Sequence, residues 1–102
     1  MTHEVTAIVE NESTDTTSDA VEIPKEFSRG SDELLVQIDI TGVGSVALEG
    51  RVSDKAAWVT IFDSKVASEL IPIAWVPFLR VVTSGAGSPT PNISVRVLRP
   101  TR

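Results

Sequence analysis

The residues of this chain that could support catalysis or bind a metal are few. The chain has a single His, at position 3, no Cys, and fourteen Asp and Glu residues. His3 is followed by Glu4, but no third ligand follows at a metal-binding spacing. The lack of Cys excludes disulfides, thiolate zinc sites and a Cys nucleophile. We therefore predict no metal, no cofactor and no catalytic residue.

Four carboxylates, Asp39, Glu49, Asp54 and Asp63, remain as candidates for acid–base chemistry. A glycoside hydrolase needs two carboxyl groups that flank one bond. Glu49 falls within a predicted strand on its polar face, and Asp54 and Asp63 fall in predicted turns. The calcium-loop spacing is missing, and the Gly-Val-Gly turn at 42–44 precedes no phosphate-binding helix. We interpret all four as surface residues and predict that the chain is not an enzyme.

Aromatic residues are candidates for binding. Trp58 is predicted to fill the core, and its alternative is an exposed platform on which a sugar ring stacks, as in a carbohydrate-binding module. Trp75 precedes Pro77 and Phe78 in a dense apolar cluster. Large apolar residues gathered beside prolines are typical of a protein-binding patch. We predict that Trp75, Pro77 and Phe78 belong to a protein interface.

Charge is distributed unevenly along the chain. Residues 1–39 carry a net charge of −8, and residues 40–102 carry +3. Arg96, Arg99 and Arg102 lie in the basic part, but no stacking aromatic is interleaved with them, so we expect no nucleic-acid partner. We predict that these arginines meet an acidic protein surface, such as the acidic arm of a neighbouring copy.

The residue pattern favours an all-β fold. Val, Ile and Thr make up 32 of the 102 residues, and β-branched side chains suit strands. Apolar residues alternate with polar ones between turn signals, with no helical periodicity. The predicted strands are 3–10, 20–23, 33–40, 45–52, 57–62, 70–73, 75–83 and 92–99. The longest apolar stretch, 70–82, is too short and too interrupted to span a bilayer, so no membrane partner is expected.

These strands predict a small antiparallel β-sandwich, jelly-roll-like, with seven to eight strands. The polar, acidic run at 11–19 has no apolar anchor and is typical of a flexible link. We therefore predict an extended N-terminal arm at 1–32, acidic and with one or two short strands, followed by a sandwich domain at 33–102. A domain this small without Cys has no disulfide to stabilise it, so we expect added stability from a homo-oligomer or from docking on a partner.

Residues 45–61 read SVALEGRVSDKAAWVTI. This segment resembles the phrase SVTLEGSxDGxxWVxL of small β-sandwich structural proteins in tailed-phage particles. The segments 77–85 and 92–97 resemble two later strands of the same family. Family members commonly have Asp-Gly in the turn before the Trp, and the turn at 53–56 has no glycine, which leaves the hairpin type open.

The resemblance implies a non-enzymatic structural role in a phage virion, which is assembled in the host cytoplasm. We expect a capsid decoration or cement subunit whose partners are the major capsid protein or other virion proteins. One alternative is a neck, tail or fibre-attachment component. A further alternative, from another class, is a carbohydrate-binding module for adhesion to a cell surface.

Overall fold

The computed structural model describes residues 2–23, 33–85 and 91–101, and the described residues form strands and no helix. In chain order the strands are β1 (Thr2–Glu12), β2 (Thr16–Thr17), β3 (Val21–Glu22), β4 (Glu33–Thr41), β5 (Ser45–Arg51), β6 (Val59–Lys65), β7 (Glu69–Ala74), β8 (Phe78–Ser84) and β9 (Asn92–Thr101). The turn predicted at 25–32 and most of the loop predicted at 84–91 lie outside these residues.

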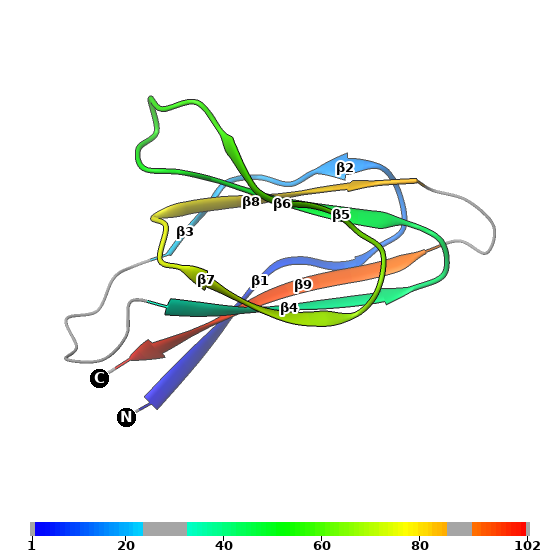
Figure 1. Cartoon of the computed structure of the whole chain (residues 1–102), viewed down its shortest axis with the longest axis horizontal. Coiled ribbons are helices and arrows are strands. Elements are labelled where there is room, and N and C mark those ends of the chain that lie inside the picture. Colours follow the sequence, from blue (N-terminus) through cyan, green and yellow to red (C-terminus); the bar gives the residue numbers. More distant parts are fainter. Residues whose placement is uncertain (1, 24–32, 86–90, 102) are drawn as a thin grey trace.

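The strands form two antiparallel sheets that pack face to face (Figure 1). Sheet A has the strand order β1-β9-β4-β7, and sheet B has the order β2-β8-β5-β6, with β3 also paired to β8. The registers of β2 and β3 on β8 differ by one residue, so these two act as one interrupted strand. Within the described strands, the chain then changes sheet at every connection except β5–β6. This is the jelly-roll topology, and the predicted jelly-roll-like sandwich is confirmed.

Alternation along β4 and β9 explains where the core lies. Leu34, Val36 and Ile38 are buried on β4, and Val95 and Val97 are buried on β9. Successive side chains of a strand point to opposite faces, so these residues all enter the space between the sheets. Sheet B closes the core from the other side with buried apolar residues at Val46, Leu48, Leu79 and Val81. The alternation predicted for the strands at 33–40 and 92–99 is confirmed.

The N-terminal segment is part of the sandwich, which corrects the predicted arm for the residues described there. β1 pairs with β9 from Thr2 opposite Thr101 to Glu12 opposite Ile93. Val9 is buried in the core. The physical reason is that β4 occupies only one edge of β9, and β1 supplies hydrogen-bonding partners for the other edge.

Residues 16–23 are attached to sheet B in the same way. The backbone N–H of Ser18 donates to the carbonyl of Val81 at 2.8 Å, and the Ser18 hydroxyl accepts from the N–H of Val81 at 2.9 Å. The hydroxyl of Thr83 donates to the carbonyl of Thr14 at 2.8 Å. Ile23 is buried in the core, as is Val9. The acidic residues between them, 10–22, are therefore held by backbone hydrogen bonds and by a buried apolar side chain on either side.

Candidate functional site

The carboxylates considered for catalysis lie on different elements. Glu49, on β5, accepts a hydrogen bond from the Nε of Arg80 at 2.6 Å. Asp63, on β6, accepts from the backbone N–H of the next residue at 2.6 Å. Asp39 lies on β4 in the other sheet, and Asp54 lies in the connection after β5.

Metal binding was considered at His3, whose side chain lies outside the described part of the structure. Among the described residues, no group of three or more His, Asp or Glu side chains is placed to hold a metal ion. In the same residues, no helix could cross a membrane.

The predicted interface residues Trp75, Pro77 and Phe78 lie where the chain passes from β7 to β8. All three are half-buried. The indole Nε1 of Trp75 donates to the carbonyl of Ile23 at 3.0 Å, and the N–H of Ile23 donates to the carbonyl of Pro77 at 2.8 Å. Trp75 also packs against the core. Sequence reasoning missed these two hydrogen bonds, which hold Ile23, the residue after β3, to the connection between β7 and β8.

The arginines of the basic part pair with acidic residues of the same chain. The Nε of Arg96 lies 3.4 Å from Glu10, and the Nη2 of Arg99 lies 3.1 Å from Glu4. Arg99 is buried, whereas Arg96 is half-exposed on the outer face of sheet A. Arg102 lies outside the described residues. The acidic and basic halves of the sequence thus meet within one chain, because β1 and β9 are neighbours in sheet A.

Trp58 lies on the outer face of sheet B, and the prediction that it fills the core is wrong. The guanidinium carbon of Arg51 lies 4.2 Å from the centroid of the Trp58 ring, and that of Arg80 lies 4.5 Å from it. Cations placed over an indole face are attracted by the ring's quadrupole. Because Arg80 also binds Glu49, the four side chains form one cluster, which we call the arginine–tryptophan cluster. It offers an aromatic ring, two cations and a carboxylate on one sheet face.

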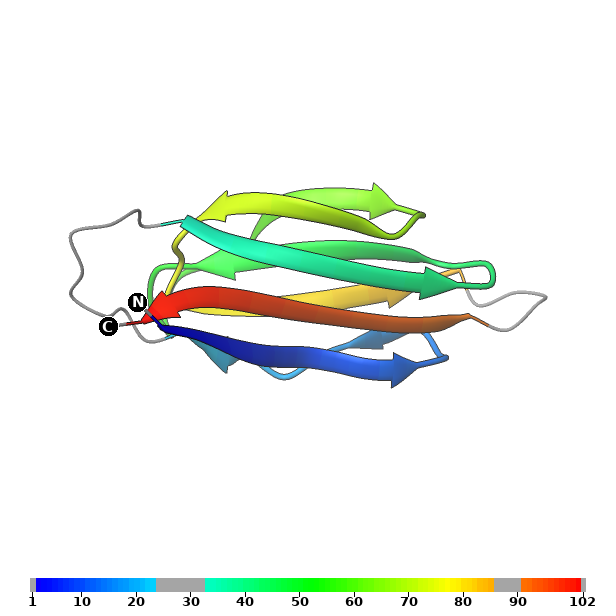
Figure 2. The ribbon, with the colours of Figure 1, turned by 90° about the horizontal axis from the view of Figure 1, so that it is seen from below.

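The outer face of sheet A carries a row of apolar side chains. Val5 lies opposite Leu98, Leu98 opposite Leu35, and Leu35 opposite Pro72, so the row crosses all four strands in register. Figure 2 looks onto this face, with β9 between β1 and β4. The neighbours of these residues along each strand point to the core, so the row points to solvent. We call Val5, Leu98, Leu35 and Pro72 the apolar row.

A shallow hollow of about 240 Å³ lies beside the apolar row. It is lined by Val5, Leu35 and Leu98 of the row together with Gln37, Leu70 and Arg96. Leu70 is 60% exposed and Val5 is 59% exposed. Leu35 and Leu98, at the centre of the row, are half-buried. The solvent face of an antiparallel sheet is ordinarily polar, so this row is a candidate binding surface.

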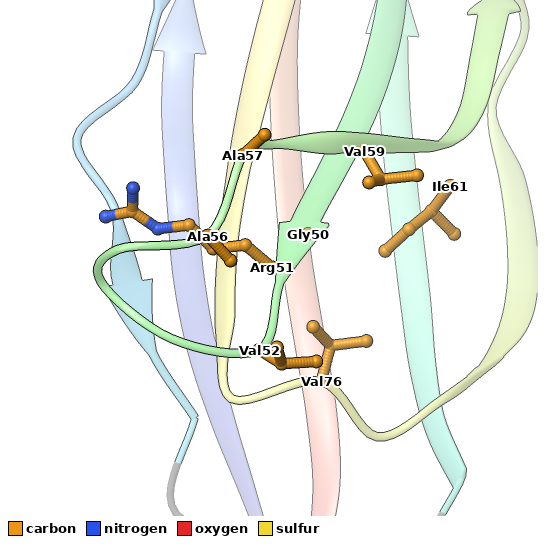
Figure 3. A pocket seen from close by; sticks show the side chains of 8 residues that line it. All are labelled: Gly50, Arg51, Val52, Ala56, Ala57, Val59, Ile61 and Val76. Carbon is orange, nitrogen blue, oxygen red and sulfur yellow. The ribbon is translucent and has the colours of Figure 1, made fainter.

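An apolar groove of about 320 Å³ lies at the end of sheet B where β5 leads toward β6. Figure 3 shows Val52, Val59, Ile61 and Val76 around it, with the Arg51 side chain extending away from them. Val52 continues the alternation of Val46 and Leu48 in the sequence, but its side chain is 77% exposed because β5 ends one residue earlier. This groove and the apolar row are the apolar surfaces that sequence reasoning missed.

Among the described carboxyl groups, that of Glu12 has a clearly perturbed pKa. Hydrogen bonds from Thr14, and then from Thr16, lower the pKa of Glu12 below its ordinary value. The two hydroxyls donate to Glu12 Oε1 at 2.7 and 3.0 Å. These bonds close the turn between β1 and β2, so the role of the Glu12 carboxylate is local.

Comparisons with protein-family models, with curated proteins and with solved structures found no match to this chain. The class of the protein is therefore given by its topology, an antiparallel jelly-roll sandwich. Its candidate sites are the apolar row on sheet A and the arginine–tryptophan cluster on sheet B.

Proposed function

We propose that this chain is a non-enzymatic structural protein of a phage virion, a capsid decoration or cement subunit. The observation that carries the proposal is the apolar row on the outer face of sheet A. Water around exposed apolar side chains is costly, and the cost is removed when a second protein surface covers them. The row extends across four strands, which suits the broad surface of a protein partner, and the hollow beside it is shallow.

The phage assignment rests on the resemblance of residues 45–61 to particle proteins of tailed phages. Jelly rolls are also used in viral capsid and lectin domains, which is support by analogy at the level of the fold. In this proposal the subunit works by repeated burial of protein surface. Weak contacts suffice because many copies bind at once on one shell.

The arginine–tryptophan cluster supplies a second surface of different chemistry. Arg51 and Arg80 outnumber the single carboxylate of Glu49, so the cluster favours an acidic surface on the shell. The partners in this proposal are the major capsid protein or other virion proteins, together with copies of the chain itself.

The proposal is tested by mixing the purified chain with empty shells assembled from the major capsid protein of the same phage. We expect the chain to sediment with the shells and to raise their melting temperature. A chain that leaves both properties unchanged is not a cement protein. Binding to isolated necks or tails, with none to shells, would assign it to the neck, tail or fibre-attachment class.

A carbohydrate-binding role is the second candidate, because Trp58 lies on an outer sheet face and not in the core. An indole on a sheet surface beside arginines and a carboxylate has the composition of a sugar-binding platform. In this reading Trp58→Ala abolishes retention on cell-surface glycans while the far-UV circular dichroism spectrum stays unchanged. Absence of retention for the unmutated chain removes this candidate.

A further inference from the structure

We propose that the arginine–tryptophan cluster binds an acidic sugar, whose carboxylate is held by the guanidinium of Arg51. This inference rests on the carbohydrate-binding candidate, because it takes the cluster as a sugar site, and it is independent of the cement function. It goes further in naming the charge of the sugar and the residue that selects it. The grounds are the unmatched charge of Arg51, the rings that order its side chain, and the donors and acceptors beside it.

Arg51 differs from the other arginines of the described residues in its partners. Arg80, Arg96 and Arg99 each form an ion pair with a carboxylate of the chain, and Arg51 forms none within the described part. The Nε of Arg51 is buried and has no hydrogen-bond acceptor among the same residues. Buried polar atoms are ordinarily hydrogen-bonded, so this donor points to an acceptor on another molecule. The parallel N–H groups of a guanidinium fit the two oxygens of a carboxylate.

Two aromatic rings order the Arg51 side chain. Its guanidinium carbon lies 4.2 Å from the centroid of the Trp58 ring and 5.8 Å from that of Phe78, which is its register partner on β8. A guanidinium stacks on aromatic faces, and its N–H groups then point out along its edge. A ligand therefore meets the N–H edge of a side chain that is already ordered, which lowers the entropy lost on binding.

The acidic side chains on the neighbouring strands leave the charge of Arg51 unmatched. Glu49 lies opposite Arg80 and pairs with it at 2.6 Å. Glu22 lies in the same register row as Arg51, but Phe78 stands between them. Two strand spacings, about 10 Å, separate Glu22 from Arg51, and charges at that distance in water are largely screened at physiological ionic strength. One cation is thus available for one carboxylate of a ligand.

The carboxylate of Glu49 favours a sugar over an acidic peptide as the ligand. Glu49 uses Oε1 to accept from Arg80, and no donor in the described chain is bonded to its Oε2. A sugar hydroxyl both donates and accepts, so it can donate to Glu49 and accept from Arg80. An ionised Asp or Glu side chain only accepts, and Glu49 repels a run of such residues. A sugar with one carboxylate and several hydroxyls, such as a uronic or sialic acid, matches this set.

The experiment is an NMR titration of the nitrogen-15-labelled full chain with glucuronate and with N-acetylneuraminate, followed at the two indole N–H signals. Trp58 lies in the cluster, whereas the Trp75 indole donates to Ile23, so the Trp75 signal is an internal control. Trp58→Phe assigns the two signals. Glucose is the neutral comparison, because it differs from glucuronate in carrying a hydroxymethyl group in place of the carboxylate. The α-amide of N-acetylglutamate represents an acidic peptide.

We expect both acidic sugars to shift the Trp58 signal and to leave that of Trp75 unchanged. The expected dissociation constant is on the order of 1 mM, as for a small ligand on an open surface. Arg51→Gln should weaken binding at least about 10-fold, and Arg51→Lys should weaken it too, because Lys keeps the charge but lacks the parallel donors. The matched control Arg96→Gln removes the same charge from sheet A and should leave the constant unchanged.

The outcomes that overturn the inference separate it from the other proposals. No Trp58 shift at about 20 mM of both acidic sugars overturns it, as does an equal loss in Arg51→Gln and Arg96→Gln. Equal binding of glucose keeps the carbohydrate-binding candidate and overturns the acidic sugar. Binding of the glutamate derivative through Arg51 with the affinity of the sugars overturns it in favour of an acidic protein segment. Sedimentation with shells is measured independently, so the cement function stands or falls on that result alone.

Discussion

Replacing Trp75 by Phe removes one hydrogen bond at the junction of the two sheets. The Trp75 indole donates to the carbonyl of Ile23 at 3.0 Å, and Ile23 is buried. Phe has no donor, so the carbonyl loses this partner at a cost of about 1–3 kcal/mol. The smaller ring also gives up apolar burial, about 0.5 kcal/mol for a half-buried side chain. We expect the free energy of unfolding to fall by about 2 kcal/mol and Tm to fall by about 10 °C.

Urea unfolding followed by far-UV circular dichroism measures this loss. The matched control is Trp58→Phe, which changes the same side chain on the outer face of sheet B. That variant should lose about 0.5–1 kcal/mol, the size of an exposed cation–π contact. If Trp75→Phe is no less stable than the control, our account of Trp75 as an anchor for Ile23 is wrong. Loss of self-association or shell binding at full stability would instead support the interface role predicted for Trp75.

Three further predictions concern packing, titration and strand order. A Cβ at Gly50 would lie 2.9 Å from both Ile61 Cδ1 and Val76 Cγ1, so Gly50→Ala should destabilise by about 1–3 kcal/mol in thermal unfolding, and an unchanged Tm would contradict this packing. The pKa of Glu12 is lowered, so its contribution to stability is present above the ordinary carboxyl pKa and is lost as pH falls through the lowered value. Thr14→Val should raise that pKa in a carbon-13 NMR titration, and no change would show that the Thr14 hydroxyl does not hold the carboxylate. Deleting β1 uncovers one edge of β9, so the shortened chain should lose its cooperative unfolding transition, and an intact transition would favour an independent arm.

The central strands could be predicted because one face of each is buried. Leu34, Val36 and Ile38 alternate with polar or half-exposed residues, as do Val95 and Val97. A central strand buries one face against the other sheet along its whole length, so apolar residues recur at every second position. The same alternation placed β4 and β9 within a residue or two of their observed bounds.

Edge segments gave weaker signals: the strands predicted at 3–10 and 70–73 are confirmed, but the assignment of the first to an arm and of Trp58 to the core was wrong. β1 turns Glu4 and Thr6 toward the inner side, opposite Arg99 and Val97, so it lacks an apolar period. β1 pairs with β9, which lies about ninety residues further along the sequence, and a local residue pattern does not reveal that pairing. Trp58 precedes the edge strand β6, where only one neighbouring strand constrains the direction of the side chains.

The apolar row was invisible to sequence reasoning for a different reason. Leu35 and Leu98, each taken alone, are ordinary residues of a sheet surface. Their alignment with Val5 and Pro72 depends on the register of four strands. A property shared across strands emerges only when the pairings are known.

The strand order also determines when the chain can fold during synthesis. β1 pairs only with β9 among the described strands, and β2 and β3 pair only with β8. At about 5–20 residues per second, the first strands leave the ribosome several seconds before their partners. During that interval they depend on their own solubility. The net charge of −8 on residues 1–39 suits this interval, because like charges keep nascent chains apart. We expect the negative charge of residues 1–39 to reduce contacts between nascent chains until β8 and β9 are made.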